Sequence, residues 1–266
     1  MRVKLLAGLL LVALASVAHA GSIFDGFDGR AAARDDDADF TERDSSRQTY
    51  QLSPGASLEI FSVSGNVTVE TSATDQAEVE IVRTARTRED LECRKFKVEA
   101  SANRLRLEGS DDRRQCRNVQ VNQSVTMRVP RRVNLDVKSV SGNVRVGELD
   151  GTAHLQSISG SATVARATGE AFITSVSGRV SVNLSQLGGG VRINSVSGSV
   201  EVGLPDGANA DVSVHSVSGS VTADMPGLTI RKIGEGSDYE GRLGAGGTQM
   251  SVSSVSGSVR FHRAGE

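Results

Sequence analysis

The sequence has 266 residues but no tryptophan and only two tyrosines, so aromatic residues make up 3% of the chain. A core built mainly from aromatic side chains is therefore excluded, and packing must rely on small β-branched residues. That composition suits thin stacked sheets better than a globular enzyme with a deep pocket. After residue 20 there is no helical period and no apolar run long enough to cross a membrane. We therefore expect an all-β mature chain without a transmembrane segment.

The first 20 residues have the pattern of a secretory signal peptide. Arg2 and Lys4 form a positive start, an apolar run covers Leu5–Val17, and Ala18-His19-Ala20 is a cleavage site of the A-x-A type. The alternative, a short membrane anchor, has too short an apolar run to span a bilayer. The pattern predicts export to the periplasm, the cell surface or the medium.

Cysteine is scarce, with only Cys93 and Cys116 in the chain. An even number of cysteines in an oxidising compartment predicts one disulfide, which would close a loop of about 24 residues and contribute about 3 kcal/mol. Two free thiols are the alternative. Two cysteines alone provide too few ligands for a metal site.

What the sequence has in abundance is one four-residue phrase, Ser-Val-Ser-Gly, with one copy reading Ser-Ile-Ser-Gly. Its seven copies end at Gly65, Gly142, Gly160, Gly178, Gly198, Gly219 and Gly257. From the second copy on, the glycines are 18, 18, 20 and 21 residues apart, and the last step is 38 residues. A fixed period of this size is typical of stacked repeats. We expect the longer last step to contain a degenerate copy, with a long glycine-rich loop over Gly227–Thr248.

Each copy also shows a shift in the alternation of apolar and polar residues. Val191 and Ile193 alternate with polar residues as a half-buried strand requires, whereas Val196 and Val200 follow the opposite parity. Both apolar sets can face inward only if the chain bends between them. We therefore expect a corner at the first serine of each phrase. We expect the glycine to face inward, at either a close approach of two backbones or a β-bulge.

One repeat thus consists of two short strands and two bends, and stacking such repeats gives a β-solenoid-like fold. A β-sandwich of hairpins is the rival arrangement, but the nearly constant repeat length favours the solenoid. The predicted segments are a signal peptide (1–20), a flexible acidic leader (21–47), an irregular N-terminal β-sheet region that caps the stack (48–133) and the repeat array (134–263).

Charge is unevenly distributed, with 14 Lys and Arg against 7 Asp and Glu in residues 83–132. One hypothesis is a basic patch centred on Arg113, Arg114 and Arg117 that binds an anionic envelope polymer or lipid head groups. The alternative is that the acidic leader and this basic region partly neutralise one another. Export and the absence of interleaved aromatic residues argue against nucleic acid as a partner.

No pattern of catalytic, cofactor-binding or metal-binding residues stands out. His154, His215 and His262 stand at different offsets from their phrases, so stacking would not align them as metal ligands. Carboxylates are scattered, and the Gly244–Gly247 run lacks the Lys-Ser/Thr of a phosphate-binding loop. We therefore predict no catalytic residues, no metal and no cofactor.

The repeated Ser-Val-Ser-Gly followed by x-Val-x-Val, the Leu52–Gly55 opening, and Val129-Pro130 leading into Leu135–Gly142 together resemble a known bacterial family. It is a β-strand-repeat family of unknown function whose members are labelled as candidate adhesins, and the resemblance covers roughly residues 48–262. It implies an all-β repeat fold and an envelope or surface setting, with no catalytic residues to carry over.

The first functional hypothesis is an exported, non-enzymatic envelope protein, an adhesin-like scaffold or interaction module for an envelope polymer or protein. The alternatives are a carbohydrate-active enzyme on a β-helix and an accessory protein of an envelope-stress system. A groove with two or more carboxylates within about 10 Å would favour the enzyme.

Overall fold

The structure is a computed structural model that describes residues 40–111, 116 and 119–265. These residues belong to one compact unit, Ala38–Glu266. The predicted signal peptide lies outside the described residues, as do residues 21–39 of the predicted leader. The described chain is almost entirely β-strand, which confirms the predicted all-β fold class.

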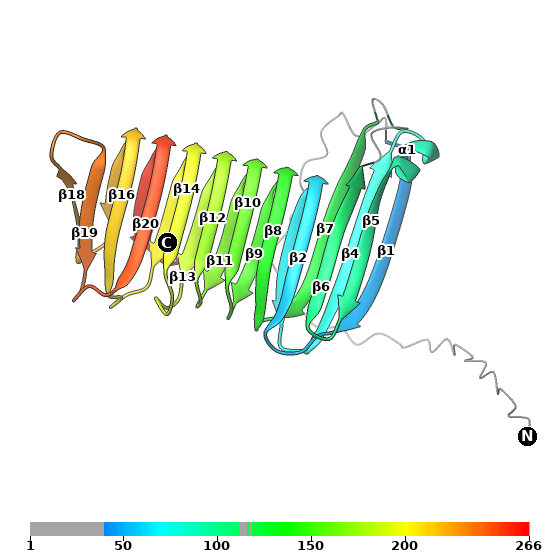
Figure 1. Cartoon of the computed structure of the whole chain (residues 1–266), viewed down its shortest axis with the longest axis horizontal. Coiled ribbons are helices and arrows are strands. Elements are labelled where there is room, and N and C mark those ends of the chain that lie inside the picture. The colour runs from blue at the N-terminus through cyan, green and yellow to red at the C-terminus, as the bar shows by residue number, and fades with distance from the viewer. Residues whose placement is uncertain (1–39, 112–115, 117–118, 266) are drawn as a thin grey trace, which may run out of the picture. The chain divides into compact units, whose positions relative to one another are not determined.

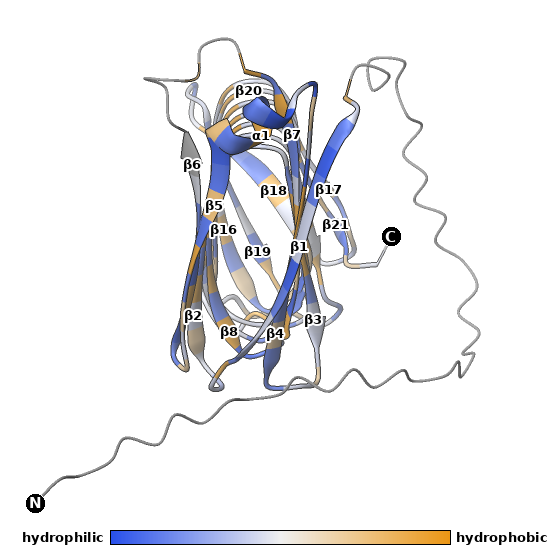
Figure 2. Ribbon diagram, turned by 90° about the vertical axis from the view of Figure 1, so that its right-hand side faces the viewer, coloured by the Kyte–Doolittle hydropathy of each residue, from blue (hydrophilic) through white to orange (hydrophobic). Residues whose placement is uncertain are grey.

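The strands form two sheets, and the hydrophobic core lies between them (Figures 1 and 2). In spatial order, sheet A consists of β1 (Glu42–Gln51), β4 (Gln76–Ala85), β7 (Val121–Pro130), β3 (Asn66–Ser72), β9 (Val144–Leu149), β11 (Ala162–Ala167), β13 (Val180–Leu184), β15 (Val200–Leu204), β21 (Val259–Arg263) and β17 (Val221–Asp224). Sheet B consists of β18 (Leu228–Ile233), β19 (Asp238–Leu243), β16 (Ala210–Ser218), β20 (Thr248–Ser256), β14 (Val191–Ser197), β12 (Ala171–Ser177), β10 (Ala153–Ser159), β8 (Val133–Ser141), β2 (Ala56–Ser64), β6 (Arg104–Asp111) and β5 (Arg94–Ser101).

Each repeat contributes one strand to sheet B and the next strand to sheet A, and equivalent strands of successive repeats pair in parallel. In sheet B, Ser157 of β10 pairs with Ser175 of β12, which pairs in turn with Ser195 of β14. Equivalent residues therefore form straight rows along the stack. Inward-facing rows such as the one with Ile173 and Ile193 are fully buried. The arrangement confirms the predicted β-solenoid.

The predicted position of the corner was wrong. Ser195, the first serine of its phrase, is 3% exposed and faces the core, whereas Val196 is 47% exposed and faces solvent. The chain turns at Gly198, whose φ of 125° is open only to glycine. A Cβ atom added at Gly198 would lie 2.0 Å from the carbonyl oxygen of Gly178. The predicted close approach of two backbones is thus confirmed. The last inward residue before the corner is therefore Ser195 rather than Ile193, and the corner lies three residues later than expected.

The predicted long loop over Gly227–Thr248 was also wrong. Most of this segment forms β18 and β19, an antiparallel hairpin that pairs with β16 at one end of sheet B (Figure 1). The C-terminal repeat then inserts between two earlier ones, because β20 pairs in parallel with both β14 and β16. In sheet A, β21 pairs likewise with both β15 and β17. The Ser-Val-Ser-Gly repeats therefore follow the order of the chain except for the last one.

The other end of the stack is closed by the longer strands of the N-terminal region. Here β4 pairs antiparallel with both β1 and β7, and β5 pairs antiparallel with β6. Residues 42–47, predicted as part of a flexible leader, belong instead to β1. This edge strand is mostly exposed and so has no clear apolar period, but it pairs with β4 along its whole length.

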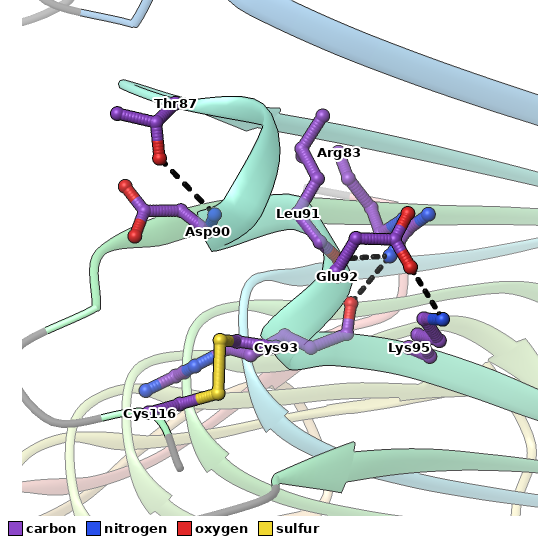
Figure 3. Close-up of a disulfide and its surroundings, with 9 residues drawn as sticks. Arg83, Thr87, Asp90, Leu91, Glu92, Cys93, Lys95 and Cys116 are labelled. Carbon is purple, nitrogen blue, oxygen red and sulfur yellow. Dashed lines mark hydrogen bonds and ion pairs between the residues drawn. A yellow bond between two sulfur atoms is a disulfide. The ribbon is translucent and has the colours of Figure 1, made fainter.

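Cys93 and Cys116 form a disulfide with a Cα–Cα distance of 5.8 Å, which confirms the predicted pairing (Figure 3). Cys93 ends α1 (Arg88–Cys93), a helix of six residues that is too short to show a helical period in the sequence. The hydroxyl of Thr87 accepts a hydrogen bond of 3.2 Å from the amide of Asp90 and caps the helix start.

Arg83 of β4 connects this helix to the strands of the N-terminal region. Its Nη1 atom donates hydrogen bonds to the carbonyl oxygens of Leu91, at 2.8 Å, and of Arg94 (Figure 3). Its Nη2 atom forms an ion pair with Asp44 of β1. The disulfide and this arginine therefore fix α1 and the starts of the edge strands to one another.

Candidate functional site

An unbroken row of apolar side chains runs along the outer face of sheet B. We call it the apolar strip; its members come from six neighbouring strands and are Val140, Ile158, Val176, Val196, Val255 and Val217. Each is between 43% and 58% exposed. The serines before and after each strip residue pair with the equivalent serines of the neighbouring strand, so the six strip residues lie in register. With strands about 4.8 Å apart, the strip is about 24 Å long.

The strip follows from the same local pattern that forms the corner. The first serine of each phrase occupies the last inward position of its strand, and the next residue must therefore face outward. Ser175 is fully buried, for example, and Val176 beside it is exposed. A contiguous exposed apolar row of this kind is uncommon on a monomeric surface, and it is typical of an interaction site.

Two rows of other side chains lie beside the strip on the same face. The middle row, two residues before the strip in each strand, is Lys138, Gln156, Thr174, Asn194, Ser253 and His215. The far row, two residues earlier again, is Asp136, His154, Phe172, Arg192, Ser251 and Ser213. In the far row, the rings of His154 and Phe172 meet edge to face at 4.8 Å, and the Arg192 guanidinium lies 5.9 Å from the Phe172 ring. The outer face is thus apolar along one side and polar across the rest.

A shallow hollow of about 360 Å³ lies at the N-terminal end of the strip. Phe61, Val140 and Ile158 contribute to its lining. Two cations lie over the Phe61 ring, Arg106 at 4.7 Å and Lys138 at 5.2 Å from its centroid. The hollow extends the apolar strip toward β2, where Arg106 is paired with Glu59 and Glu108 and Lys138 is paired with Asp136.

A second, polar groove of about 580 Å³ lies near the other end, beside β18 and β19. Asp211 and Glu240 both line it, and their strands place them diagonally across the β16–β19 pair. Diagonal neighbours have Cα atoms about 7–8 Å apart, so this groove brings two carboxylates onto neighbouring strands, as the enzyme alternative requires. Asp211 already accepts hydrogen bonds from the Gly247 amide, at 3.0 Å, and from Arg242, at 2.9 Å. These two donors lower the pKa of the Asp211 carboxyl below its usual range.

The predicted basic patch of Arg113, Arg114 and Arg117 lies outside the described residues and remains a prediction. The histidines are separated on the fold. His154 contacts Phe172, His215 pairs with Asp238 at 2.7 Å, and His262 contacts a backbone carbonyl. Within the described part of the chain, no three His, Cys, Asp or Glu side chains gather as metal ligands.

Sequence reasoning missed the apolar strip because it assigned the middle valine of each phrase to the core. The usable signal was the parity of the preceding strand. Val191 and Ile193 face inward, so uninterrupted alternation places Ser195 inward and Val196 outward.

The chain is thus a parallel-rich, two-sheet solenoid with an exposed apolar strip on one sheet. It belongs to the family described as Toastrack DUF4097, whose model matches residues 55–172 and 134–261. No curated protein matches the sequence significantly. In the described residues, no helix is long and apolar enough to span a membrane.

Two similar solved structures have names that describe them as candidate adhesion proteins. A cell adhesion candidate of Clostridium sporogenes is 11% identical, with a TM-score of 0.46, and the match covers 83% of this chain and 100% of the other. An adhesin candidate of Bacteroides fragilis is 15% identical, with a TM-score of 0.37, and the match covers 82% of this chain and 97% of the other. Similarity this distant supports no argument about the function of this chain.

Proposed function

We propose that this protein is an exported, non-enzymatic interaction module of the bacterial envelope, an adhesin-like scaffold that binds through the outer face of sheet B. The observation that carries the proposal is the apolar strip, because burying an exposed apolar row is a general source of binding free energy. The polar middle and far rows beside the strip resemble the polar rim of a protein interface.

Export is supported by two independent features of the chain. The first 20 residues have the pattern of a signal peptide. The disulfide between Cys93 and Cys116 is of a kind that persists in oxidising compartments such as the periplasm or the cell exterior. An exported protein should begin at Gly21, and N-terminal sequencing of the extracytoplasmic protein tests this directly.

A non-enzymatic role is supported by the lining of the polar groove. A glycosidase needs one carboxyl group with a raised pKa as general acid. The hydrogen bonds from Gly247 and Arg242 lower the pKa of Asp211, which leaves Glu240 as the one carboxyl group of the groove for that role. None of the residues that line this groove is aromatic, so it offers no platform for a sugar ring.

The test is binding of the purified mature chain to separated envelope fractions: peptidoglycan, outer membrane and anionic lipid vesicles, each over a range of salt concentrations. The strip variant is Val176→Lys, and its matched control is Ser181→Lys on the outer face of sheet A. The control residue is partly exposed and lies in the same repeat. A third variant, with Arg113, Arg114 and Arg117 changed to Glu, tests the predicted basic patch.

We expect the chain to bind at least one fraction, and we expect Val176→Lys to weaken that binding more than Ser181→Lys does. Salt-sensitive binding that the triple arginine variant lacks would add the basic patch as a second contact. The proposal is wrong if no fraction is bound or if both lysine variants bind as well as the parent. Turnover of an envelope glycan that Glu240→Gln abolishes would establish the enzyme alternative.

A further inference from the structure

We infer that the partner on the outer face of sheet B is a second copy of the same chain, packed face to face with its stack running in the opposite direction. The inference rests on the proposed function and concerns the same surface: in solution a second copy covers the strip, and an envelope partner would have to displace that copy. It depends on a twofold rotation that places the strip, the middle row and the far row of one copy on the same rows of the other.

The twofold axis would lie in the plane of the interface, perpendicular to the strip, and pass between β12 and β14. These strands are the third and fourth of the six that form the strip, so the axis divides it equally. Each strip residue then faces an apolar residue of the partner, in the pairs Val176 with Val196, Ile158 with Val255 and Val140 with Val217. The same patch is used on both copies, as closed twofold symmetry requires.

The polar rows are also self-complementary about this axis. In the middle row, Thr174 faces the partner's Asn194, and Lys138 faces the partner's His215. Within the six strands, no carboxylate faces a carboxylate in either row. His215 is already hydrogen-bonded to Asp238 at 2.7 Å, so a carboxylate lies close to the incoming lysine. The far row continues beyond the six strands to Glu59 of β2 and Glu240 of β19, and these two carboxylates would face each other at the edges of the contact, so the attraction must come from the six central strands.

In the far row, Arg192 of each copy faces Phe172 of the other, on both sides of the axis. Within one copy the Arg192 guanidinium already lies 5.9 Å from the Phe172 ring, so both side chains stand on the outer surface. In the dimer the same guanidinium can stack on the partner's ring, where exclusion of water strengthens a cation–π contact. The face therefore provides two identical pairs from one arginine and one phenylalanine.

The area of the face matches that of a specific interface. The six strands span about 29 Å across the sheet, and seven residues of each strand span about 23 Å. Each copy thus offers about 650 Å², and two copies together could bury up to about 1,300 Å², near the lower end of the range of stable protein interfaces. Twisted sheets pack with their strands about 30° apart, so the contact is closest at the centre, where Val176 and Val196 lie.

The experiment measures the mass of the mature chain, residues 21–266, by sedimentation equilibrium over a range of concentrations without any envelope material. We expect a dimer. We also expect Val176→Lys to weaken association at least about 100-fold, because each dimer would bury two unpaired ammonium groups. Ser181→Lys should leave association unchanged. A chain that stays monomeric while it binds an envelope fraction would overturn this inference and leave the proposed function intact.

Spin labels on the outer face of sheet A test the direction of packing without touching the interface. Thr68→Cys and Ser181→Cys lie in one row, three strands apart, and both native cysteines are in the disulfide. Opposed copies would place the Thr68 labels about 45 Å apart and the Ser181 labels about 30 Å apart. Equal separations at the two sites would overturn the proposed arrangement.

A last variant tests whether the predicted leader is the occupant instead. A chain starting at residue 40 retains every described residue, and we expect it to dimerise as the mature chain does. If the mature chain is monomeric and the shortened chain is a dimer, residues 21–39 occupy the strip and the inference is wrong.

Discussion

Replacing Gly198 by alanine adds one methyl group at the corner where two repeats touch. The backbone there has a φ of 125°, and the added Cβ would lie 2.0 Å from the carbonyl oxygen of Gly178. A non-glycine residue in such a conformation costs about 1–3 kcal/mol. Relieving the overlap also separates the strands near two hydrogen bonds, from the Gly178 amide to Ser197 at 3.1 Å and from the Val180 amide to Ser199 at 2.9 Å. Each is worth about 1 kcal/mol, so we expect a total loss of about 3–5 kcal/mol.

The matched control is Gly207→Ala, in the turn after β15. Gly207 also has a positive φ, 72°, but no atom lies within 4 Å of an added Cβ. Alanine there should cost only about 1–2 kcal/mol, the strain of the left-handed conformation. Urea unfolding followed by circular dichroism compares the two variants. If Gly198→Ala were no less stable than Gly207→Ala, contact between neighbouring corners would not be what requires glycine.

Three further predictions concern the core, the inserted repeat and the polar groove. Ser175→Ala should leave stability unchanged or raise it by up to about 1 kcal/mol, because this buried hydroxyl has no hydrogen-bond partner among the described residues; a clear loss in urea unfolding would contradict this. Removing residues 248–266 deletes β20 and β21, so hydrogen exchange should show lost protection in β16 and β19 but retained protection in β8 and β10; unchanged protection of β16 would refute the inserted order. The hydrogen bond from Gly247 and the charge of Arg242 lower the pKa of Asp211. The ionised Asp211 carboxylate therefore stabilises the fold above the pKa of the unfolded state, and this contribution disappears as the pH falls through the lower pKa of the folded state. In an NMR titration, Arg242→Gln should raise the pKa of Asp211; an unchanged value would rule out the guanidinium as a cause.

The repeat architecture could be predicted because its signal is the spacing of one residue type. A glycine every 18–21 residues marks a backbone position with a positive φ and a neighbouring carbonyl so close that it requires glycine. The disulfide was also predictable, since an exported chain with two cysteines has one simple pairing. These features depend on local chemistry that does not require knowledge of which strands become neighbours.

The apolar strip was harder to predict because valine favours β-strands whether its side chain faces the core or solvent. Val176 and Val180 look alike in the sequence, yet one is 43% exposed and the other is fully buried. What separates them is the position of the corner relative to Ser175. A small polar residue can lie at the end of a thin core, so its polarity alone gave a misleading indication of which way it faces.

The position of the last repeat could not be derived from the phrase itself. Every copy presents the same corner, so the contacts of Gly257 would be equally good on either side of Gly219. The deciding element is the hairpin of β18 and β19, which follows β16 directly in the chain. Because this hairpin pairs antiparallel with the outer edge of β16, only the inner edge remains for a parallel neighbour. The C-terminal repeat must therefore enter between β14 and β16, and the hairpin closes the end of the sheet that the repeat would otherwise have extended.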